Sequence, residues 1–308
     1  MSTASVLIPS DTGDLGAPRG SVPRLPRYSL LLSTDADSIE AAQRLRHDVF
    51  ASEPGFTVPT ETTVDGGRSD GGGFNGGGIN GGRSNGGLDA DHFDQYCDHL
   101  LVRDDDTSEL VGCYRMLPPP GAIAAGGLYT ATEFDVSPLD SLRPSLVEMG
   151  RAVVRADHRN GAVVLLMWGG ILAYLDRSGY DYVTGCVSVP VADPTGHTAA
   201  GSRLRGVRDF VMRRHAAPAE YTVRPHRPVV IDGRGLDDID APARVSVPPL
   251  MRGYLRLGAQ ICGEPAHDPD FGVGDFPALL DKRNADARYL RRLRSAGAAS
   301  AIAGGTAS

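Results

Sequence analysis

The chain has 308 residues, of which 41% are hydrophobic, and its formal net charge is −7 at pH 7. This acidic balance argues against a nucleic-acid-binding protein, because contact with the phosphate backbone requires a basic surface. No apolar run reaches the length of a membrane span, and we expect no signal peptide because no short apolar core stands near the first residue. The length allows one large domain or two small ones.

The four cysteines are scattered, so they match neither a structural zinc motif nor a disulfide framework. Each lies in or beside an apolar run, where a buried, inert thiol is more common than a nucleophile. Cysteine usage therefore predicts a protein of the reducing cytoplasm, and no metal site is expected.

Composition divides the chain into one folded domain and three loose segments. Residues 1–26 are rich in Ser, Pro and Gly, residues 66–87 are rich in glycine, and residues 295–308 are mostly Ala, Gly and Ser. Glycine loses the most conformational freedom on ordering and buries no side chain. We therefore expect a flexible N-terminal tail, a flexible insertion and a disordered C-terminal tail around a single domain at 27–294.

The domain begins with a strand and a helix. Residues 28–33 have strand composition, and apolar side chains recur at helical spacing over residues 38–52, after capping side chains at 34–37. Arg46 lies on this helix one turn before Phe50. Its spacing alone is equally compatible with an Arg46 side chain that is exposed to solvent.

An acidic segment, residues 89–98, precedes a hairpin with strands at 99–103 and 109–117. The segment suits either a solvated loop or a cradle for a cationic substrate. Its four carboxylates are Asp89, Asp91, Asp94 and Asp98. Arg115 lies inside the apolar second strand, and a buried arginine usually has a carboxylate partner. The candidate partners are Asp94, Asp98 and Glu148.

The most informative stretch is residues 146–177. Residues 146–154 have strand character, residues 158–161 form a polar turn, and residues 162–177 are apolar over a helical length. A strand that turns directly into a helix leaves the first N–H groups of that helix free. Those donors, together with the helix dipole, suit a phosphate.

Glu148 and Arg151 stand three residues apart in this strand, which puts them on opposite faces unless a β-bulge intervenes. Charged side chains in an apolar strand are costly to bury without partners or a function. The chemistry alone leaves open a plain strand–helix unit with one internal ion pair.

The remainder alternates strands and helices. We expect a strand at 180–190 and another at 221–231 that Pro225 and Pro228 break. We also expect a basic helix at 198–215, a helix at 248–257 that Gly258 ends, and a basic helix at 284–294. Pro277 predicts that residues 274–280 form an edge strand, because proline cannot donate to a ladder.

The motifs, taken in order, resemble those of a known family. Arg46-x-x-x-Phe50, Asp91-x-x-Asp94, Arg115-Met-Leu-Pro118 and Glu148-x-x-Arg151 are similar to the ordered motifs of the acyl-homoserine-lactone synthases. The resemblance is stronger to their relatives, the ornithine-lipid N-acyltransferases. It rests there on residues 98–102, 247–254 and 258–271, and it covers roughly residues 28–282.

This resemblance implies a GNAT-like fold, an α/β (α+β) domain whose mixed central sheet has splayed central strands and flanking helices. In that fold the pantetheine of the acyl donor lies between the splayed strands, and its phosphate sits on the helix N-terminus. The matching positions here are Val153, Val154, Arg159, Asn160, Gly161 and Ala162.

The implied reaction moves a fatty acyl group, often 3-hydroxylated, from acyl carrier protein to the α-amino group of ornithine or a similar amino acid, giving a lyso-ornithine-type lipid. Glu148 would take a proton from the attacking amine, and a backbone N–H near Val153–Val154 would stabilise the oxyanion. Catalysis is thus assigned to Glu148, Arg151 and Arg115.

The acceptor site is predicted at the acidic segment. Its carboxylates would attract a diamino-acid cation, and one arginine could grip the acceptor's carboxylate by a bidentate contact. Arg46, Arg115 and Arg151 would also pair with Asp91, Asp94 and Glu148. The predicted substrate-binding residues are Arg46, Phe50, Asp91, Asp94 and Asp98.

No tightly bound cofactor is expected, since acyl carrier protein or coenzyme A brings the acyl group as a co-substrate. Acyl carrier protein is acidic, so the basic helices at 198–215 and 288–294 are candidate docking faces, with ordinary solvated helices as the alternative. The second helix could instead rest on an anionic membrane, which would make the protein cytoplasmic with a peripheral contact at the inner membrane.

Two other functions stay open. One is a signal synthase of the acyl-homoserine-lactone type that uses S-adenosylmethionine, against which the motifs at 247–254 and 258–271 argue. The other is a non-catalytic protein that binds acyl carrier or lipid. The sequence does not decide the acyl chain length, the donor or the acceptor amine.

Overall fold

The computed structural model describes residues 5–8, 28–53, 83–84, 87–159, 161–193, 196–288, 290–291 and 293. Most of the predicted N-terminal tail and glycine-rich insertion, and the whole predicted C-terminal tail, lie outside the described residues. Within the predicted N-terminal tail, Ser5–Ile8 forms strand β1 and pairs with β2, so these four residues continue the sheet.

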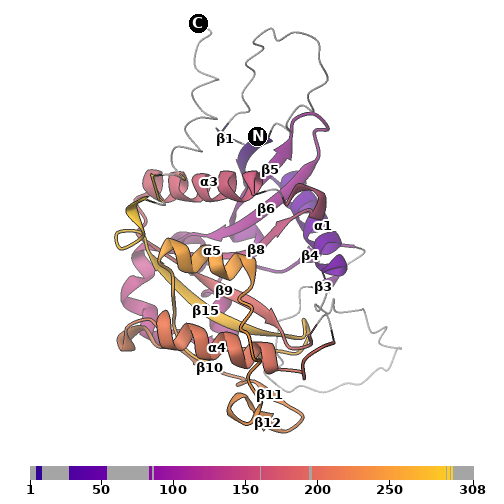
Figure 1. The fold of residues 1–308 in the computed structure, drawn as a ribbon. Coiled ribbons are helices and arrows are strands. Elements are labelled where there is room, and N and C mark those ends of the chain that lie inside the picture. The colour runs from indigo at the N-terminus through magenta and orange to yellow at the C-terminus, as the bar shows by residue number, and fades with distance from the viewer. Residues whose placement is uncertain are drawn as a thin grey trace, which may run out of the picture.

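A nine-stranded mixed sheet runs through the molecule, with the order β1-β2-β5-β6-β8-β9-β15-β13 and with β14 also paired to β15 (Figure 1). All neighbouring strands are antiparallel except β8 and β9, which are parallel. The strand bounds are β2 Tyr28–Ser33, β5 Asp98–Asp104, β6 Leu110–Leu117, β8 Leu146–Val154, β9 Tyr182–Pro190, β13 Gln260–Ile261, β14 Ala266–Asp268 and β15 Val273–Asp281.

Five α-helices are described: α1 Ala36–Ser52, α2 Pro119–Ala124, α3 Ala162–Ser178, α4 Ser202–Arg214 and α5 Pro249–Leu257. Short 3-10 turns lie between them, including η1 Asp94–Tyr96, η2 Tyr129–Thr132, η3 Ser137–Ser145 and η4 Ala156–His158. Small two-residue strands also occur: β3 Arg83–Ser84, β4 Asp89–Ala90, β7 Phe134–Asp135, β10 Arg224–Pro225, β11 Val230–Ile231 and β12 Arg234–Gly235.

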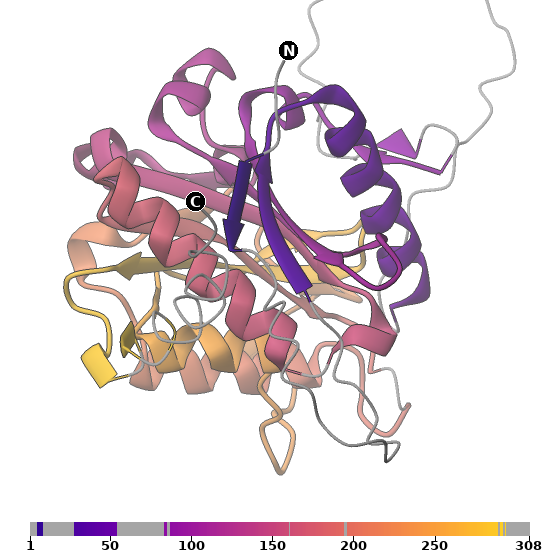
Figure 2. The same ribbon diagram turned by 90° about the horizontal axis from the view of Figure 1, so that it is seen from above.

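The helices cover both faces of the sheet (Figure 2). Apolar side chains of α3, α4 and α5 join the main core on one face. On the other face α1 packs through Ala42, Leu45 and Val49 onto β5, β6 and β8. No helix among the described residues is long and apolar enough to cross a membrane.

Local signals in the sequence explain the helix ends. Asp35 accepts a hydrogen bond from the N–H of Ser38 at 3.0 Å, which caps α1 as predicted. Gly258, with a φ of 102°, ends α5, since this left-handed conformation is costly for other residues.

The two central strands part after a short contact. Pairing of β8 with β9 is limited to Leu146↔Tyr182, Val147↔Val183 and Glu148↔Thr184. Gly185 stands where they separate, and a Cβ there would lie 2.1 Å from the carbonyl oxygen of Met149. The splayed central strands expected from the sequence are therefore present.

A β-bulge follows in β8. Between the pairs Arg115↔Gly150 and Cys113↔Val153, β6 advances two residues and β8 advances three. Arg151 has a φ of 53°, an uncommon conformation for a residue other than glycine. The extra residue brings Val153 onto the face that Glu148 occupies, so the intervening bulge that the sequence left open is present.

One expectation for the second half of the chain was wrong. Residues 274–280 do not form an edge strand, because β15 lies between β9 and the pair β13 and β14. The carbonyl of Pro277 accepts from Cys262 N–H at 2.7 Å, so its nitrogen faces the gap between β13 and β14, where no ladder donor is needed. The interrupted strand expected at 221–231 is present as the two short strands β10 and β11, in agreement with breaks at Pro225 and Pro228.

Candidate active site

A cavity of about 980 Å³ opens where β8 and β9 part. Its walls come from both strands, α3, α5, β15 and the end of α1. Most predicted site residues line it: Phe50, Arg115, Glu148, Arg151, Val153, Val154, Arg159, Gly161 and Ala162. Arg46, Asp91, Asp94 and Asp98 are not among the lining residues, and Asn160 lies outside the described residues.

The acidic segment is locked to three arginines beside the cavity. Arg46 donates to Asp89 at 2.9 Å and to Asp94 at 2.8 Å, while Arg115 donates to Asp91 at 2.6 Å and to Asp94 at 3.1 Å. Arg151 lies 3.4 Å from both Asp89 and Asp91. Three guanidinium groups thus balance three carboxylates, a network that ties α1, the acidic segment, β6 and β8 together.

The arginines favour the ionised forms of Asp91 and Asp94 in this network. Burial opposes ionisation of Asp91, but Arg115 and Arg151 hold the pKa of its carboxyl below the usual range. Arg46 and Arg115 lower the pKa of Asp94 against the same opposing effect. The predicted pairing was therefore right for Asp91 and Asp94, whereas no partner was predicted for Asp89.

Glu148 is buried and does not belong to that network, so the predicted arginine pairing of Glu148 was wrong. Its Oε1 accepts from the N–H of Thr130 at 2.7 Å and from the Thr130 hydroxyl, and its Oε2 accepts from the N–H of Tyr129. Turn η2 therefore holds this carboxylate with neutral donors. A carboxylate oxygen has room for a second donor, so Oε2 keeps acceptor capacity beside the cavity.

Burial raises the pKa of Glu148 above its usual range, although the hydrogen bonds from Thr130 and Tyr129 act in the opposite direction. A carboxylate whose pKa is raised by desolvation is a better proton acceptor near neutral pH. The position of Glu148 and its pKa both suit general-base chemistry.

Arg151 is the most loosely held of the three arginines. Its guanidinium lies between two aromatic rings, 5.2 Å from the centre of Tyr129 and 5.5 Å from that of Phe271. Both of its ion-pair distances are 3.4 Å, longer than those of Arg46 and Arg115. An aromatic stack with long ion pairs leaves a guanidinium able to bind a further anion.

The gap edge of β8 presents backbone groups to the cavity. Arg155 N–H donates to Val111 of β6 at 2.8 Å, and successive N–H groups of a strand point to opposite edges, so the N–H of Val154 points toward β9. Arg159 donates to the carbonyl of Val154 at 2.9 Å on the same edge. Gly161, with a φ of 79°, is the N-cap residue of α3 and provides no side-chain cap. The helix N-terminus expected to bind a phosphate therefore opens onto the cavity.

Asp98 lies away from these groups. Its carboxylate accepts from the hydroxyl of Tyr174, which is on α3, at 2.7 Å. This placement gives no support to its predicted role in substrate binding.

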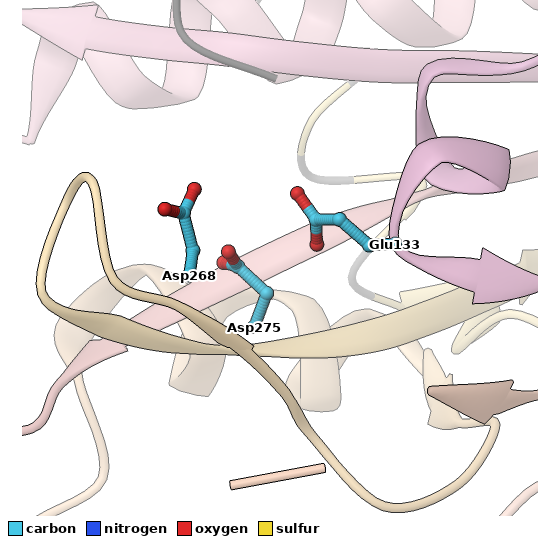
Figure 3. A group of neighbouring side chains, drawn as sticks. All are labelled: Glu133, Asp268 and Asp275. Atoms are coloured by element: carbon cyan, nitrogen blue, oxygen red, sulfur yellow. The ribbon is translucent and has the colours of Figure 1, made fainter. Parts of the chain in front are cut away.

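Sequence reasoning missed three acidic residues of the cavity wall. Glu133 comes from the segment between η2 and β7, and Asp268 and Asp275 come from the β14–β15 hairpin; their carboxylates point toward one another (Figure 3). One signal was available, since Asp268 begins a motif that supports the family resemblance. Glu133 stands in no motif, and only the fold brings it to the hairpin.

The opposite wall of the cavity is aromatic and apolar. Trp168 of α3 and Tyr254 of α5 are in edge contact, with ring centres 5.3 Å apart, and the hydroxyls of Tyr254 and Tyr114 are hydrogen-bonded to each other. Met149, Met167 and Val187 complete this wall. Such a surface is complementary to a hydrocarbon chain.

Comparison with known proteins agrees with this geometry. Residues 75–169 match the family model of the acetyltransferase (GNAT) domain. An L-ornithine N(alpha)-acyltransferase of Brucella abortus (strain 2308) is 33% identical over 277 residues, which cover 87% of this chain and 89% of the relative. The chain belongs to the L-ornithine N(alpha)-acyltransferase family.

A second relative has the same name. An enzyme of the same name from Rhizobium meliloti (strain 1021) is 32% identical over 280 residues, covering 87% of this chain and 84% of the relative. Among solved structures, a CoA-dependent acyl-homoserine lactone synthase with MTA matches at 15% identity and a TM-score of 0.43, covering 84% of this chain and 82% of that one. Membership of the family and the GNAT domain make this protein an acyltransferase.

Proposed function

We propose that this acyltransferase moves a fatty acyl group, 3-hydroxylated or plain, from the thioester of acyl carrier protein to the α-amino group of ornithine. The product would be a lyso-ornithine-type lipid. The observation that carries the proposal is the buried Glu148 at the point where β8 and β9 part, inside a cavity with one apolar and one charged wall. The names of the relatives supply the acceptor.

The acyl donor fits the gap. Its pantetheine arm would run between β8 and β9, and its phosphate would meet the N-terminus of α3 together with Arg159. The acyl chain would pack along the wall formed by Trp168, Tyr254 and Met149. The thioester carbonyl would then lie near the N–H of Val154, which is aimed into the gap.

The reaction needs a neutral amine. Glu148 accepts a proton from the α-ammonium group, directly or through a water molecule, and the amine nitrogen then attacks the thioester carbonyl carbon. The oxyanion receives a hydrogen bond from Val154 N–H. The carbon–sulfur bond breaks as the carbonyl re-forms, the amide nitrogen loses its second proton, and the thiolate of the carrier takes up a proton.

Arginines at the mouth of the cavity favour a phosphorylated, acidic donor. Arg159, Arg203 and Arg256 line the cavity, and Arg213 and Arg214 are exposed at the end of α4. Arg205 and Arg208 of the same helix are engaged by Asp209, Asp237 and Glu264, which narrows the predicted docking face. Of the predicted basic segment 288–294, three positions lie outside the described residues.

A peripheral membrane contact at the same mouth is part of the proposal. Val164 and Leu250 are apolar residues that both line the cavity and stand 39% and 40% exposed. Apolar side chains beside arginines suit the boundary of an anionic lipid layer, into which a single-chain product would partition.

The decisive experiment offers purified protein a long-chain acyl carrier thioester with ornithine, and identifies the product by mass spectrometry. We expect Nα-acylornithine from the wild type and a loss of product with Glu148→Gln. Acyl coenzyme A in place of the carrier separates the two donors. A folded wild type that binds acyl carrier protein but acylates no amine would contradict the proposal and favour a binding role.

A further inference from the structure

The carboxylates of Glu133, Asp268 and Asp275 form a compact group on the cavity wall. One oxygen from each lies within 4.8 Å of the others, and all three side chains are at least nine-tenths buried (Figure 3). None of them forms a salt bridge with a basic side chain among the described residues. Buried carboxylates gathered in this way repel one another unless a cation joins them.

One atom of this group is unsatisfied. The Oε2 of Glu133 is buried without a hydrogen-bond partner in the described part of the chain, and the side chain points toward the two aspartates. Asp275 accepts from the Ser188 hydroxyl at 2.5 Å, and Asp268 accepts from the N–H groups of Asp270 and Phe271 at 2.9 and 3.2 Å. The aspartates are thus positioned, while Glu133 offers an acceptor that needs a donor.

We infer that these three carboxylates bind the distal ammonium group of a diamino-acid acceptor. This inference rests on the proposed function and names the part of the site that selects the acceptor. An alkylammonium has three N–H donors, one for each carboxylate. Two oxygens that accept from one tetrahedral nitrogen at about 2.9 Å are about 4.7 Å apart, so a single nitrogen reaches all three.

The rest of the acceptor fits the neighbouring groups. Turn η2 donates to Glu148 through Tyr129 and Thr130, and Glu133 follows the same turn, so the proton acceptor and the ammonium site are joined by one short segment. Arg151, stacked between Tyr129 and Phe271, would bind the α-carboxylate. The acceptor is then held at three points, with its α-amine beside Glu148.

The electrostatics of the cluster agree with a site that binds a cation. Burial and the neighbouring aspartates raise the pKa of Glu133 well above its usual range. Burial likewise raises the pKa of Asp275 to about 7 and the pKa of Asp268 above its ordinary value. By contrast, arginines neutralise the acidic segment 89–94, which leaves it no unbalanced charge for an acceptor.

The test compares ornithine with norvaline, which has the same carbon chain without the distal amine. We expect wild-type kcat/KM to favour ornithine by about 100-fold or more, and expect that ratio to fall about 10- to 100-fold in Glu133→Gln and in Asp275→Asn. Glu40→Gln is the matched control, because Glu40 is exposed on α1 and does not line the cavity. It should keep the wild-type ratio.

The outcomes separate this inference from the proposed function. Equal use of ornithine and norvaline by the wild type, or an unchanged ratio in both folded variants, overturns the inference and leaves N-acylation standing. If the wild type acylates neither compound, isothermal titration calorimetry of ornithine binding to wild type and Asp275→Asn tests the ammonium site directly. Binding that weakens at least tenfold in Asp275→Asn supports the ammonium site, and equal or undetectable binding rejects it. Mn²⁺ binding that is lost in Asp275→Asn while the ornithine ratio is unchanged would identify a metal site and overturn the inference.

Discussion

Two groups of carboxylates lie close to Arg151, and they differ in whether arginines neutralise them. Asp89, Asp91 and Asp94 are each paired with a guanidinium. The second group consists of Glu133, Asp268 and Asp275, which have no such partner among the described residues. Arginines lower the pKa values of Asp91 and Asp94 in the first group, whereas burial raises those of Glu133 and Asp275 in the second.

The difference shows which charges belong to the scaffold and which are available to a ligand. The first group fastens the acidic segment to the sheet and positions Arg115 and Arg151. The second group lines the cavity with carboxylates that have no fixed counter-charge among the described residues. Burial alone would not distinguish them, since both groups are largely enclosed; the presence of fixed counter-charges does.

Glu148 provides the largest expected effect, because it is a carboxylate that belongs to neither group. Glu148→Gln keeps the side-chain shape but removes the proton acceptor, so kcat should fall about 10²- to 10⁴-fold. Steady-state kinetics with a saturating acyl donor measures it. An unchanged melting temperature and retained binding of acyl carrier protein would exclude misfolding, and a fall of less than tenfold would contradict the general-base role.

Asp94→Asn breaks the paired group at its most shared member. Asp94 accepts from both Arg46 and Arg115, and its loss leaves two buried guanidinium groups undercompensated, so the free energy of unfolding should fall by about 3–5 kcal/mol. Chemical denaturation measures the change. Because arginines lower the pKa of Asp94, its contribution is present above the unfolded pKa and is lost as the pH falls; a variant as stable as wild type at pH 7 would refute the scaffold role.

Asp275→Asn tests the unpaired group, and here we expect the substitution to increase stability. The folded-state pKa of about 7 lies above the unfolded value, so the folded protein holds a proton that the unfolded chain releases, and wild-type stability should fall as pH rises through that window. The asparagine variant should lose this slope and gain about 1–3 kcal/mol over wild type near pH 8. Asp268, Glu133 and Arg151 face the same carboxylate, so a residual slope from Asp268 and Glu133 is expected. Chemical denaturation at pH 5 and pH 8 measures both proteins. The same pH dependence of the free energy of unfolding in wild type and Asp275→Asn would contradict the prediction.

Glu40→Gln should have the smallest effect of these substitutions. Glu40 and Arg44 form an exposed pair one turn apart on α1, more than half accessible on both sides. Solvent screens such a pair, so stability should change by about 0.5 kcal/mol or less. The same denaturation assay measures it, and a larger loss would mean that charge pairing outside the core also supports the fold.

The central unit of the fold was predictable because each of its signals is local. Strand β8, the turn and α3 follow from hydrophobic periodicity and an Asn-Gly turn, and the family motifs located Glu148 and Arg151. Alternation alone put those two side chains on opposite faces. The sequence left a β-bulge at this point open without predicting it, because no local signal indicates that Arg151 adopts a left-handed backbone conformation.

The remainder depended on tertiary context. Pro277 indicates an edge in isolation, but the gap between β13 and β14 accommodates it. Four neighbouring carboxylates in the sequence suggested a single acceptor site. In the structure Asp89, Asp91 and Asp94 form ion pairs with arginines, and Asp98 accepts a hydrogen bond from Tyr174. The unpaired group joins residues more than a hundred positions apart, which no spacing rule connects.

The short contact between β8 and β9 divides the sheet into two half-sheets. Three residue pairs hold this seam, whereas β9 and β15 share nine. Local opening should therefore begin at the seam, and backbone amides of β8 beyond Glu148 that face the gap should exchange their hydrogens with solvent faster than amides of β15. A pantetheine arm lying in the seam would act as a missing strand, so each catalytic cycle would alternately stiffen and loosen the molecule along this line.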